Sequence, residues 1–284
     1  MKGVRRAKAW LSALLAVLLL LPVGTLFLTA CSEAPPLFRV LVLDVGQSDA
    51  ILLSSGDHHM LIDTGTALAR DDLFGALRQY GVEKLEYLLL THEHEDHVGN
   101  ARAVLEGFAV DQLLTARIGD GERGYDQALQ TAVNEDCPHN VVEKGDIFSL
   151  GNATCEVLLA KGDADNDGSV VLRVGFGETV FLFMGDAGAA AEGALLYLYP
   201  AEYLKCDVLK VGHHGSNTAG SEPFLHTVAP LFAAISCGTD NAHGLPHKDV
   251  LDRLAATGAA VDRTDLSGTL VYMSDGQEVR KLQS

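Results

Sequence analysis

The chain has 284 residues, 48% of them hydrophobic, and its formal net charge is −17. This composition can bury the core of a globular domain, and no Pro-, Ser- or charge-rich run divides the chain, so we expect one main domain. The first 30 residues hold basic but no acidic side chains, which leaves 17 basic against 38 acidic residues, a net of −21, in the remainder. That balance excludes nucleic-acid binding driven by a Lys/Arg excess, so metal ions and a small local patch would have to hold any nucleic-acid substrate.

The N-terminal segment has the pattern of an export signal. A basic start precedes an almost unbroken apolar run from Trp10 to Leu21, and Leu28-Thr29-Ala30-Cys31 follows. Small residues directly before a cysteine resemble the lipobox of bacterial lipoproteins. The resemblance implies a signal peptide over 1–30, a lipidated Cys31 as the first mature residue, a tether over 31–37 and a domain over 38–284. An uncleaved signal anchor is the alternative, and both place the domain outside the cytoplasmic membrane, attached to it.

Export changes the interpretation of the remaining cysteines. In an oxidising compartment they could form up to two disulfides. No Cys-x-x-Cys pair is present, so we do not expect thiolate metal binding. The four residues are Cys137, Cys155, Cys206 and Cys237.

The domain alternates short apolar runs with turns and helical patterns. Period-2 and short apolar runs predict strands at 38–43, 50–53, 60–62, 85–90, 110–115, 207–211, 231–235 and 269–273, with a further set of strands between 141 and 184. Period-3.6 patterns predict helices at 71–80 and at about 97–106, 122–134, 189–198 and 248–256. Helices mixed with hairpins and single strands favour two sheets covered by helices over a doubly wound parallel sheet.

The strongest chemical signal is Thr91-His92-Glu93-His94-Glu95-Asp96-His97, directly after the apolar run 87–90. A loop that leaves a strand end can turn His92 and His94 toward one point, while Asp96 and His97, at the start of the next helix, face a second point. Neutral imidazole and carboxylate bind zinc, manganese or iron. Three histidines and three acids within six residues disfavour the alternative of a solvated polar turn, so we predict a two-metal site.

Two later segments place further ligands after apolar strands. The run 181–184 is followed by Gly185-Asp186, which would present the Asp186 carboxylate as a bridge between two cations. A turn aspartate is the alternative for Asp186 alone. The run 208–211 leads to adjacent histidines, and because successive residues of an extended segment point opposite ways, we expect only one to bind metal. His213 is the predicted ligand, and His214 the predicted outer support or substrate contact.

This order and spacing of His-x-His-x-Asp-His, Gly-Asp and a later histidine resembles the metallo-β-lactamase superfamily. Within it, the chain resembles the soluble hydrolase domain of the ComEC competence DNA-uptake protein and its free-standing relatives. The segments that carry this likeness are 43–50, 61–65, 209–216, 246–247 and 263–265. The resemblance covers about residues 38–275. It implies an α/β fold, a four-layer αβ/βα sandwich, with two divalent metal ions, zinc or manganese, at one edge.

Two residues outside the ligand motifs receive supporting roles. Asp63, between the run 60–62 and a Thr-Gly turn, would accept hydrogen bonds that hold the metal loop, and turn capping is the alternative. Leu245 stands where the family's Gly-His-Pro-His run would have its first histidine, which leaves His247 as the matched residue. His247 would donate to a substrate phosphoryl oxygen, and simple exposure is the alternative. Ser48 replaces a glycine of the relatives, which would only retune a turn.

The chain departs from the family where a third histidine of the first metal is expected. No histidine occurs between His139 and His213, and Asn166, Asp167 or Ser169 lies where the subgroup has Asn and Ser. We therefore expect water or an amide oxygen to complete the first site. Harder oxygen ligands would shift the preference from zinc toward manganese.

These features together predict a metal-dependent hydrolase. Two cations would activate a bridging water for attack on phosphorus or a carbonyl, with Asp96 and His247 as the catalytic residues beside them. The predicted substrate is a small ester or phosphodiester, and DNA or a cell-envelope polymer remains open. The alternatives are an esterase acting on a phosphorylcholine-bearing envelope polymer and a non-catalytic lipoprotein that assists DNA uptake. A lactamase is disfavoured because the segments that carry the family likeness resemble ComEC-type proteins.

The anchor can be tested separately from the chemistry. We expect Cys31→Ser to keep hydrolytic activity and to lose lipid attachment, because the sulfur is the acylated atom, so that the protein leaves the membrane fraction or remains unprocessed. Fractionation together with mass spectrometry of the mature N-terminus measures both effects. Unchanged fractionation without a lipid mass on the wild-type N-terminus would instead favour the signal anchor.

Overall fold

The computed structural model describes residues 37–116, 123–161 and 166–282. The predicted signal peptide, Cys31 and nearly all of the tether lie outside these residues. The described part from Leu37 onward belongs to one compact unit. Within the described ranges, no helix is long and apolar enough to cross a membrane.

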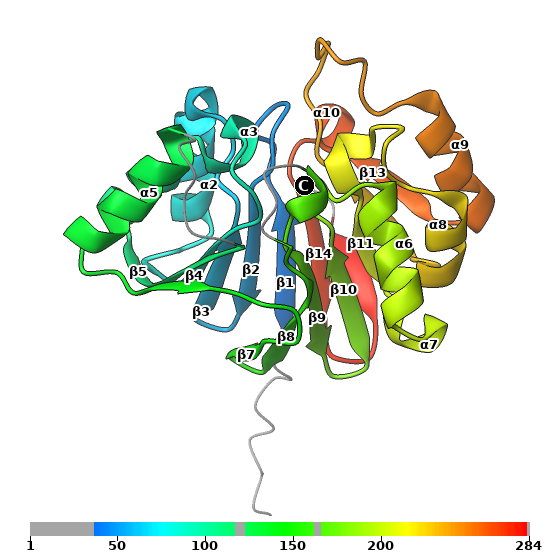
Figure 1. Ribbon diagram of the computed structural model, residues 1–284, viewed down its shortest axis with the longest axis horizontal. Helices are drawn as coiled ribbons and strands as arrows, with labels where there is room; N and C mark the ends of the chain where they lie inside the picture. The colour runs from blue at the N-terminus through cyan, green and yellow to red at the C-terminus, as the bar shows by residue number, and fades with distance from the viewer. Residues whose placement is uncertain (1–36, 117–122, 162–165, 283–284) are drawn as a thin grey trace, which may run out of the picture. The chain divides into compact units, whose positions relative to one another are not determined.

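Two sheets form the centre of this unit (Figure 1). The first sheet has eight strands in the order β15 (Val279–Leu282), β14 (Leu270–Ser274), β1 (Phe38–Val42), β2 (Ile51–Ser55), β3 (His58–Ile62), β4 (Lys84–Leu90), β5 (Ala109–Thr115) and β6 (His139–Val141). The second has seven strands in the order β13 (Ala260–Arg263), β12 (Phe232–Ile235), β11 (Val208–Lys210), β10 (Thr179–Phe183), β9 (Val171–Phe176), β8 (Ala153–Leu159) and β7 (Ile147–Leu150).

Helices cover the outer face of each sheet, as Figure 1 shows for α2 and α5 on one side and α6, α8 and α9 on the other. The helices beside the first sheet are α2 (Arg70–Gln79), α3 (Glu95–Val98), α4 (Ala101–Gly107) and α5 (Arg123–Asn134). The later helices are α6 (Ala189–Leu198), α7 (Ala201–Leu204), α8 (Glu222–Val228), α9 (Lys248–Thr257) and α10 (Thr264–Ser267). Short 3₁₀ turns occur at η1 (Ala67–Ala69), η2 (Asn166–Gly168) and η3 (Gly212–Gly215).

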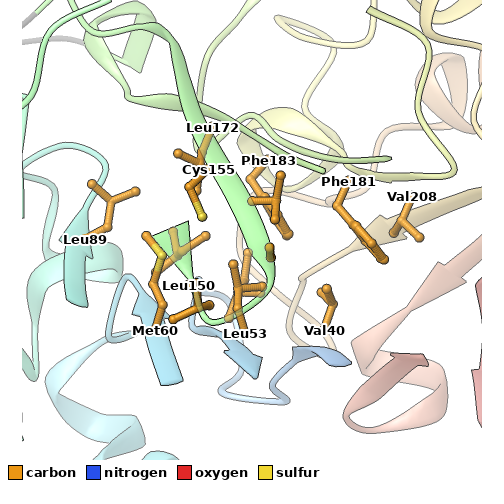
Figure 2. Close-up of a cluster of buried hydrophobic side chains, with 14 of the residues drawn as sticks. Val40, Leu53, Met60, Leu89, Leu150, Cys155, Leu172, Phe181, Phe183 and Val208 are labelled. Atoms are coloured by element: carbon orange, nitrogen blue, oxygen red, sulfur yellow. The ribbon is translucent and has the colours of Figure 1, made fainter. Parts of the chain in front are cut away.

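The alternation of side chains along each strand explains the four layers. In β1, Phe38 and Val40 belong to the apolar cluster between the sheets, whereas Leu41 belongs to the cluster under α2, α4 and α5. Successive side chains along the strand therefore pack into different layers. Figure 2 shows side chains of both sheets meeting in the middle cluster, among them Leu53 and Phe181. A third cluster lies under α6, α8 and α9. The predicted αβ/βα sandwich is confirmed.

One predicted helix is interrupted. The pattern over about 97–106 forms α3 and α4, which are separated at Gly99 and Asn100. A Cβ atom on Gly99 would lie 2.4 Å from the backbone nitrogen of Ala67, and the Asn100 amide donates to the carbonyl oxygens of Thr64 and Thr66. The turn after β3 thus packs against the break, and periodicity within one helix does not reveal such a contact. The sequence patterns also missed β13, β15, α7, α8 and α10, which are short.

The cysteines do not pair. Cys137, Cys155, Cys206 and Cys237 are free and buried in the described part of the chain. Burial raises the pKa of the Cys155 thiol to about 12. The two disulfides that the sequence would permit are therefore not formed.

Candidate metal centre

The predicted ligands converge because parallel strands end at one edge of each sheet. In the first sheet β3 runs parallel to β4, and in the second β10 runs parallel to β11, so the loops after these strands start at the same level. Gly185 has φ +53°, and a Cβ atom there would lie 3.1 Å from Thr91 Cβ. This turn needs a glycine because it passes so close to the loop after β4. It brings Asp186 against the histidine motif.

One group of ligand atoms is tight. Asp96, His97, Asp186 and His214 each offer an atom within 4.8 Å of all the others. Nε2 of His97 lies 3.3 Å from Asp186 Oδ1, and Nε2 of His214 lies 3.2 Å from Asp96 Oδ2. The two longer separations are 3.8 Å for His97 Nε2 to Asp96 Oδ2 and 3.7 Å for His214 Nε2 to Asp186 Oδ1. Two ligands that each lie about 2.1 Å from one ion are at most about 4.2 Å apart, so all four separations suit a single cation.

A second group faces the other oxygen of Asp186. Nε2 of His92 lies 3.9 Å from Asp186 Oδ2 and 3.1 Å from Nδ1 of His94. Nε2 of His213 lies 3.7 Å from the same Oδ2 atom. The carboxylate of Asp186, 2% exposed, therefore stands between the two groups, with one oxygen toward each. This is the position that the sequence predicted for a bridging ligand.

The histidines are oriented by contacts behind their rings. Nδ1 of His97 donates to Asp63 Oδ2 over 2.8 Å, and Nδ1 of His214 donates to the carbonyl oxygen of Ser236 over 2.9 Å. Oxygens of these kinds only accept, so Nδ1 carries the proton and Nε2 is the atom left for a cation. Among the described residues, neither Nε2 of His97 nor Oδ1 of Asp186 makes a hydrogen bond, although both atoms are buried. The residues present therefore fit divalent metal ions.

The electrostatics of the cluster also call for positive charge. Burial by itself would lower the pKa of His97, but the carboxylates of Asp186 and Asp63 outweigh it and raise that pKa well above 6.5. At His214 burial would likewise lower the pKa, but Asp186 and Asp49 outweigh it and raise the pKa to about 10. In the protein alone, protons on these histidines offset the negative charge of Asp186 and Asp63, while Lys210 faces Asp49. Metal ions would replace those protons.

The backbone of the tandem histidines is not extended. The extended segment from which we expected only one of them to bind metal is therefore absent. His213 has φ 48° and ψ 47°, and His214 has φ 52° and ψ 25°, both in the left-handed region. The backbone amide of His213 donates to the carbonyl oxygen of Gly185, which ties this turn to that of Asp186. His214, predicted as an outer support, lies in the tight group, and His213, predicted as the ligand, lies beside Asp186 Oδ2.

The other predicted residues surround the two groups. Asp63, 1% exposed, accepts from the backbone amide and the hydroxyl of Thr91 as well as from His97. The hydroxyl of Ser169 accepts from the backbone amide of Asp186 over 3.2 Å. The amide nitrogen of Asn166 lies 3.3 Å from both ring nitrogens of His213. The structure thus brings Asp63, Ser169 and Asn166 to the centre as neighbours of the predicted ligands, while their roles stay predictions.

Sequence reasoning missed a buried ion pair behind the site. Lys210 and Asp49 are 0% and 1% exposed, and their charged groups lie 2.8 Å apart. Asp49 Oδ1 is also 3.4 Å from Nδ1 of His214. Burial by itself would raise the pKa of Asp49, but Lys210 and His214 lower it. Both residues lie in segments that carry the family likeness, and a lysine at a core position of an apolar strand was the available signal.

The centre opens into a pocket of about 490 Å³, which is in the range of small-molecule sites. Asp96, His213 and His214 line it. The remaining polar lining includes Gln47, Thr66, Glu95, Ser216, His243 and His247. Nδ1 of His247 accepts from the backbone amide of Asn217 over 2.9 Å, so its Nε2 carries a proton and can donate.

Comparison with known proteins gives consistent results. A family model described as the metallo-beta-lactamase superfamily matches residues 43–238. Over 82% of its length the chain is 30% identical to ComE operon protein 3 of Bacillus subtilis (strain 168) and 34% identical to competence protein ComA of Neisseria gonorrhoeae. It spans only 33% and 32% of those two relatives. The resemblance to competence proteins that the motifs predict is confirmed.

Solved structures agree on the fold. YhfI from Bacillus subtilis, a metallo-beta-lactamase fold protein, has a TM-score of 0.58 at 16% identity, and the match covers 84% of this chain and 100% of that one. CmlA, a diiron beta-hydroxylase from Streptomyces venezuelae, has a TM-score of 0.55 at 14% identity, covering 87% of this chain and 54% of that one. At such low identity, these two likenesses concern the fold alone.

The buried ion pair predicts a stability effect. Lys210→Met leaves the Asp49 carboxylate in the core without its cationic partner, so we expect the free energy of unfolding of the metal-free protein to fall by about 3–5 kcal/mol. In Asp49→Asn/Lys210→Met the unpaired charge is gone, and the double variant should be more stable than the single one. Urea denaturation at pH 7 measures both. Equal stability of the two variants would contradict an ion pair at this place.

Metal binding should release protons. With a pKa raised to about 10, His214 is protonated at pH 8 in the metal-free protein, whereas a ligand histidine must be neutral at Nε2. We expect about one to two protons to leave per chain on metal loading at pH 8, His97 supplying the second, and metal affinity to rise as pH approaches 10. Titration calorimetry in buffers of different ionisation enthalpy counts the protons. Heats that do not depend on the buffer would show that these two rings carry no extra proton in the metal-free protein.

Proposed function

The chain belongs to the metallo-β-lactamase superfamily, and from this premise we propose that it is a dinuclear metal-dependent hydrolase that cleaves phosphodiesters. The observation that carries the proposal is the carboxylate of Asp186, which presents one oxygen to each of two groups of ligand atoms. A structural zinc site is normally closed by four ligands, whereas these groups adjoin an open pocket. A metal-dependent hydrolase is the activity that the fold supports.

Asp186 and Asp96 would have different roles at such a centre. Two divalent ions supply Lewis acidity and an activated water when bound. Asp186 would hold the two sites next to each other, because its one buried carboxylate offers an oxygen to each group of ligand atoms. Asp96, whose side chain is 33% exposed, lines the pocket and would offer a ligand oxygen there.

His247 would act on the substrate from the pocket wall. Because its Nδ1 accepts from the backbone amide of Asn217, its Nε2–H is directed to act as a donor and not as a base. A donor at this place can stabilise the charge that develops on a phosphoryl oxygen or on the leaving group. Because the nucleophile would be an activated water, the proposed hydrolysis needs no serine or cysteine nucleophile.

The charge of the pocket favours substrates with a single phosphodiester in the site. Glu95 and Asp96 line it, and no lysine or arginine does so among the described residues. Without basic side chains to neutralise neighbouring phosphates, the cations would have to hold the scissile group. This supports a small phosphodiester or the end of a polymer chain over a long nucleic acid held along its backbone.

The cellular setting of this activity is also a proposal. Lipid attachment at Cys31 would hold the domain on the outer side of the cytoplasmic membrane, where DNA and envelope polymers are both accessible. The similarity to competence protein ComA supports a DNA-related role. An esterase acting on a phosphorylcholine-bearing envelope polymer and a non-catalytic lipoprotein are the outcomes that the following experiment distinguishes.

We expect the purified full-length chain, loaded with manganese or zinc, to hydrolyse bis(p-nitrophenyl) phosphate. Asp186→Ala should lower this turnover by more than about 1000-fold, because it removes the shared carboxylate of both sites. Release of p-nitrophenolate measures the rate, and elemental analysis measures the metal content. Near wild-type turnover and metal content in Asp186→Ala would remove this residue from the site.

Matched variants and substrates separate the alternatives. His247→Ala should keep the metal content and lose about 100-fold in kcat, because it removes only a donor to the substrate. Faster hydrolysis of p-nitrophenylphosphorylcholine than of bis(p-nitrophenyl) phosphate would favour the envelope esterase, and turnover of nitrocefin would indicate a lactamase. Two bound ions without turnover of any of these substrates would favour the non-catalytic lipoprotein.

A further inference from the structure

Two charged side chains lie behind the loop that follows the tandem histidines. Glu192 of α6 is 1% exposed, and its carboxylate accepts from the backbone amide of Gly220 over 2.6 Å and from that of Ser221 over 2.8 Å. Arg253 of α9, half-buried, donates through Nε to the carbonyl oxygen of Gly220 over 2.6 Å and through Nη2 to that of Ala219 over 3.2 Å. Opposite charges from two helices therefore hold the loop backbone between them.

The same loop determines how His247 is placed. The backbone amide of His247 donates to the carbonyl oxygen of Gly215 over 3.0 Å, and the backbone amide of Asn217 donates to Nδ1 of its ring over 2.9 Å. The second contact decides which ring nitrogen carries the proton, because a ring nitrogen that accepts a hydrogen bond has none. The loop 215–221 thus sets both the position of His247 and the nitrogen from which it donates.

Both helices are joined to this loop at more than one point. His247 is the N-cap of α9 and Arg253 lies on the same helix, so α9 contacts the loop through both residues. At the start of α6, one turn before Glu192, the backbone amide of Ala189 donates to the carbonyl oxygen of Thr218 over 2.8 Å. Figure 1 shows α6, α8 and α9 on the same side of the second sheet. A change at either charged residue would therefore reach His247 through the loop.

Stability alone is a weak reason for these two charges. Burial raises the pKa of the Glu192 carboxyl, so its ionised form at neutral pH costs free energy of folding. In return, hydrogen bonds to a charged group are about twice as strong as those between neutral groups. Glu192 and Arg253 use such bonds on the backbone of one loop, from opposite sides. This arrangement favours a single loop conformation at a cost in stability.

We propose that Glu192 and Arg253 are positioning residues for hydrolysis, which hold the loop 215–221 so that His247 keeps Nε2–H as its donor. This rests on the proposed function, in which His247 donates to a phosphoryl oxygen or to the leaving group. Both residues act through the loop, because neither lines the pocket in the described part of the chain. The alternative is a purely structural role at the start of α8, where Ser221 makes no side-chain cap of its own.

The ring of His247 reports on the loop without any turnover. In nitrogen-15 spectra of the full-length, histidine-labelled chain with zinc at pH 9, we expect one tautomer of His247, protonated at Nε2. Its signal is assigned by its absence in His247→Ala. Glu192→Gln presents N–H groups where backbone amides need an acceptor, so the Asn217 amide should move away from Nδ1 and the two tautomers should mix. Arg253→Met should mix them too, and Arg253→Lys, which keeps the charge without the fork, should do so less.

Kinetics should show the same dependence. With bis(p-nitrophenyl) phosphate we expect Glu192→Gln to lower kcat by about 10-fold, with KM and metal content unchanged, because only the donor is displaced. In Glu192→Gln/His247→Ala the loss should equal that of His247→Ala alone, because both changes remove the same donor. A structural loss at the start of α8 would instead multiply the two effects.

A matched control removes another carboxylate that supports a helix. Glu156 accepts from the hydroxyl of Tyr203 in α7, and its partner lies outside the loop 215–221. Glu156→Gln should keep the His247 tautomer and kcat. Thermal unfolding of each variant shows whether lower stability by itself changes either measurement. Because Arg253 is half-buried, its two variants decide the question if Glu192→Gln does not fold.

Several results would overturn the proposal. An unchanged His247 spectrum in folded Glu192→Gln and Arg253→Met would show that the pair does not position this ring. Multiplied losses of kcat in Glu192→Gln/His247→Ala would leave only the structural role. Loss of metal from Glu192→Gln would connect the pair to the metal centre instead of His247. Because the tautomer is read without substrate, a chain with the expected spectra that hydrolyses no phosphodiester contradicts the proposed function and leaves the positioning of His247 standing.

Discussion

The carboxylate of Asp186 is the constraint on which the rest of the centre depends. It is 2% exposed, and histidines from two different loops approach each of its oxygens. A charge buried so deeply is stable only with opposite charge nearby. In the protein alone His97 and His214 supply that charge by holding protons, and in the proposed enzyme cations would do so. Because of Asp186, the protonation of His97 and His214 and the binding of metal ions to the cluster therefore depend on each other.

A polar cluster of this size inside a sandwich needs support from behind. Asp63 holds His97 and the loop after β4, and Asp49 faces the ring of His214. Lys210 compensates Asp49 from within an apolar strand. Each support comes from a strand end of one of the two sheets, so the sheets position the ligands and their outer contacts together. This explains why the edge of the sandwich can tolerate so many buried polar groups.

The distribution of charge shapes what the site can accept. The chain beyond residue 30 has a net charge of −21, and acidic Glu95 and Asp96 line the pocket. Attraction of an anionic substrate must then come from the centre itself and from donors such as His247. This separates the proposed enzyme from proteins that hold nucleic acid along a basic surface. In the proposed phosphodiesterase, occupied metal sites would then be a condition for binding the substrate as well as for cleaving it.

Much of this was determined by the sequence alone. Alternating and 3.6-residue patterns predicted most strands and helices, because burial on one face imposes those periods. The run 91–97 predicted a metal centre, since the chemistry of its side chains does not depend on the rest of the fold. The tertiary structure decided what depends on distant contacts: the break at Gly99, the pairing of Lys210 with Asp49, and the direction of His213 and His214. At these histidines the predicted extended backbone was wrong, because an apolar strand followed by two histidines predicts continued extension. The actual turn is held by Gly185, some 28 residues earlier in the chain, and local sequence patterns carry no information about a contact over that separation.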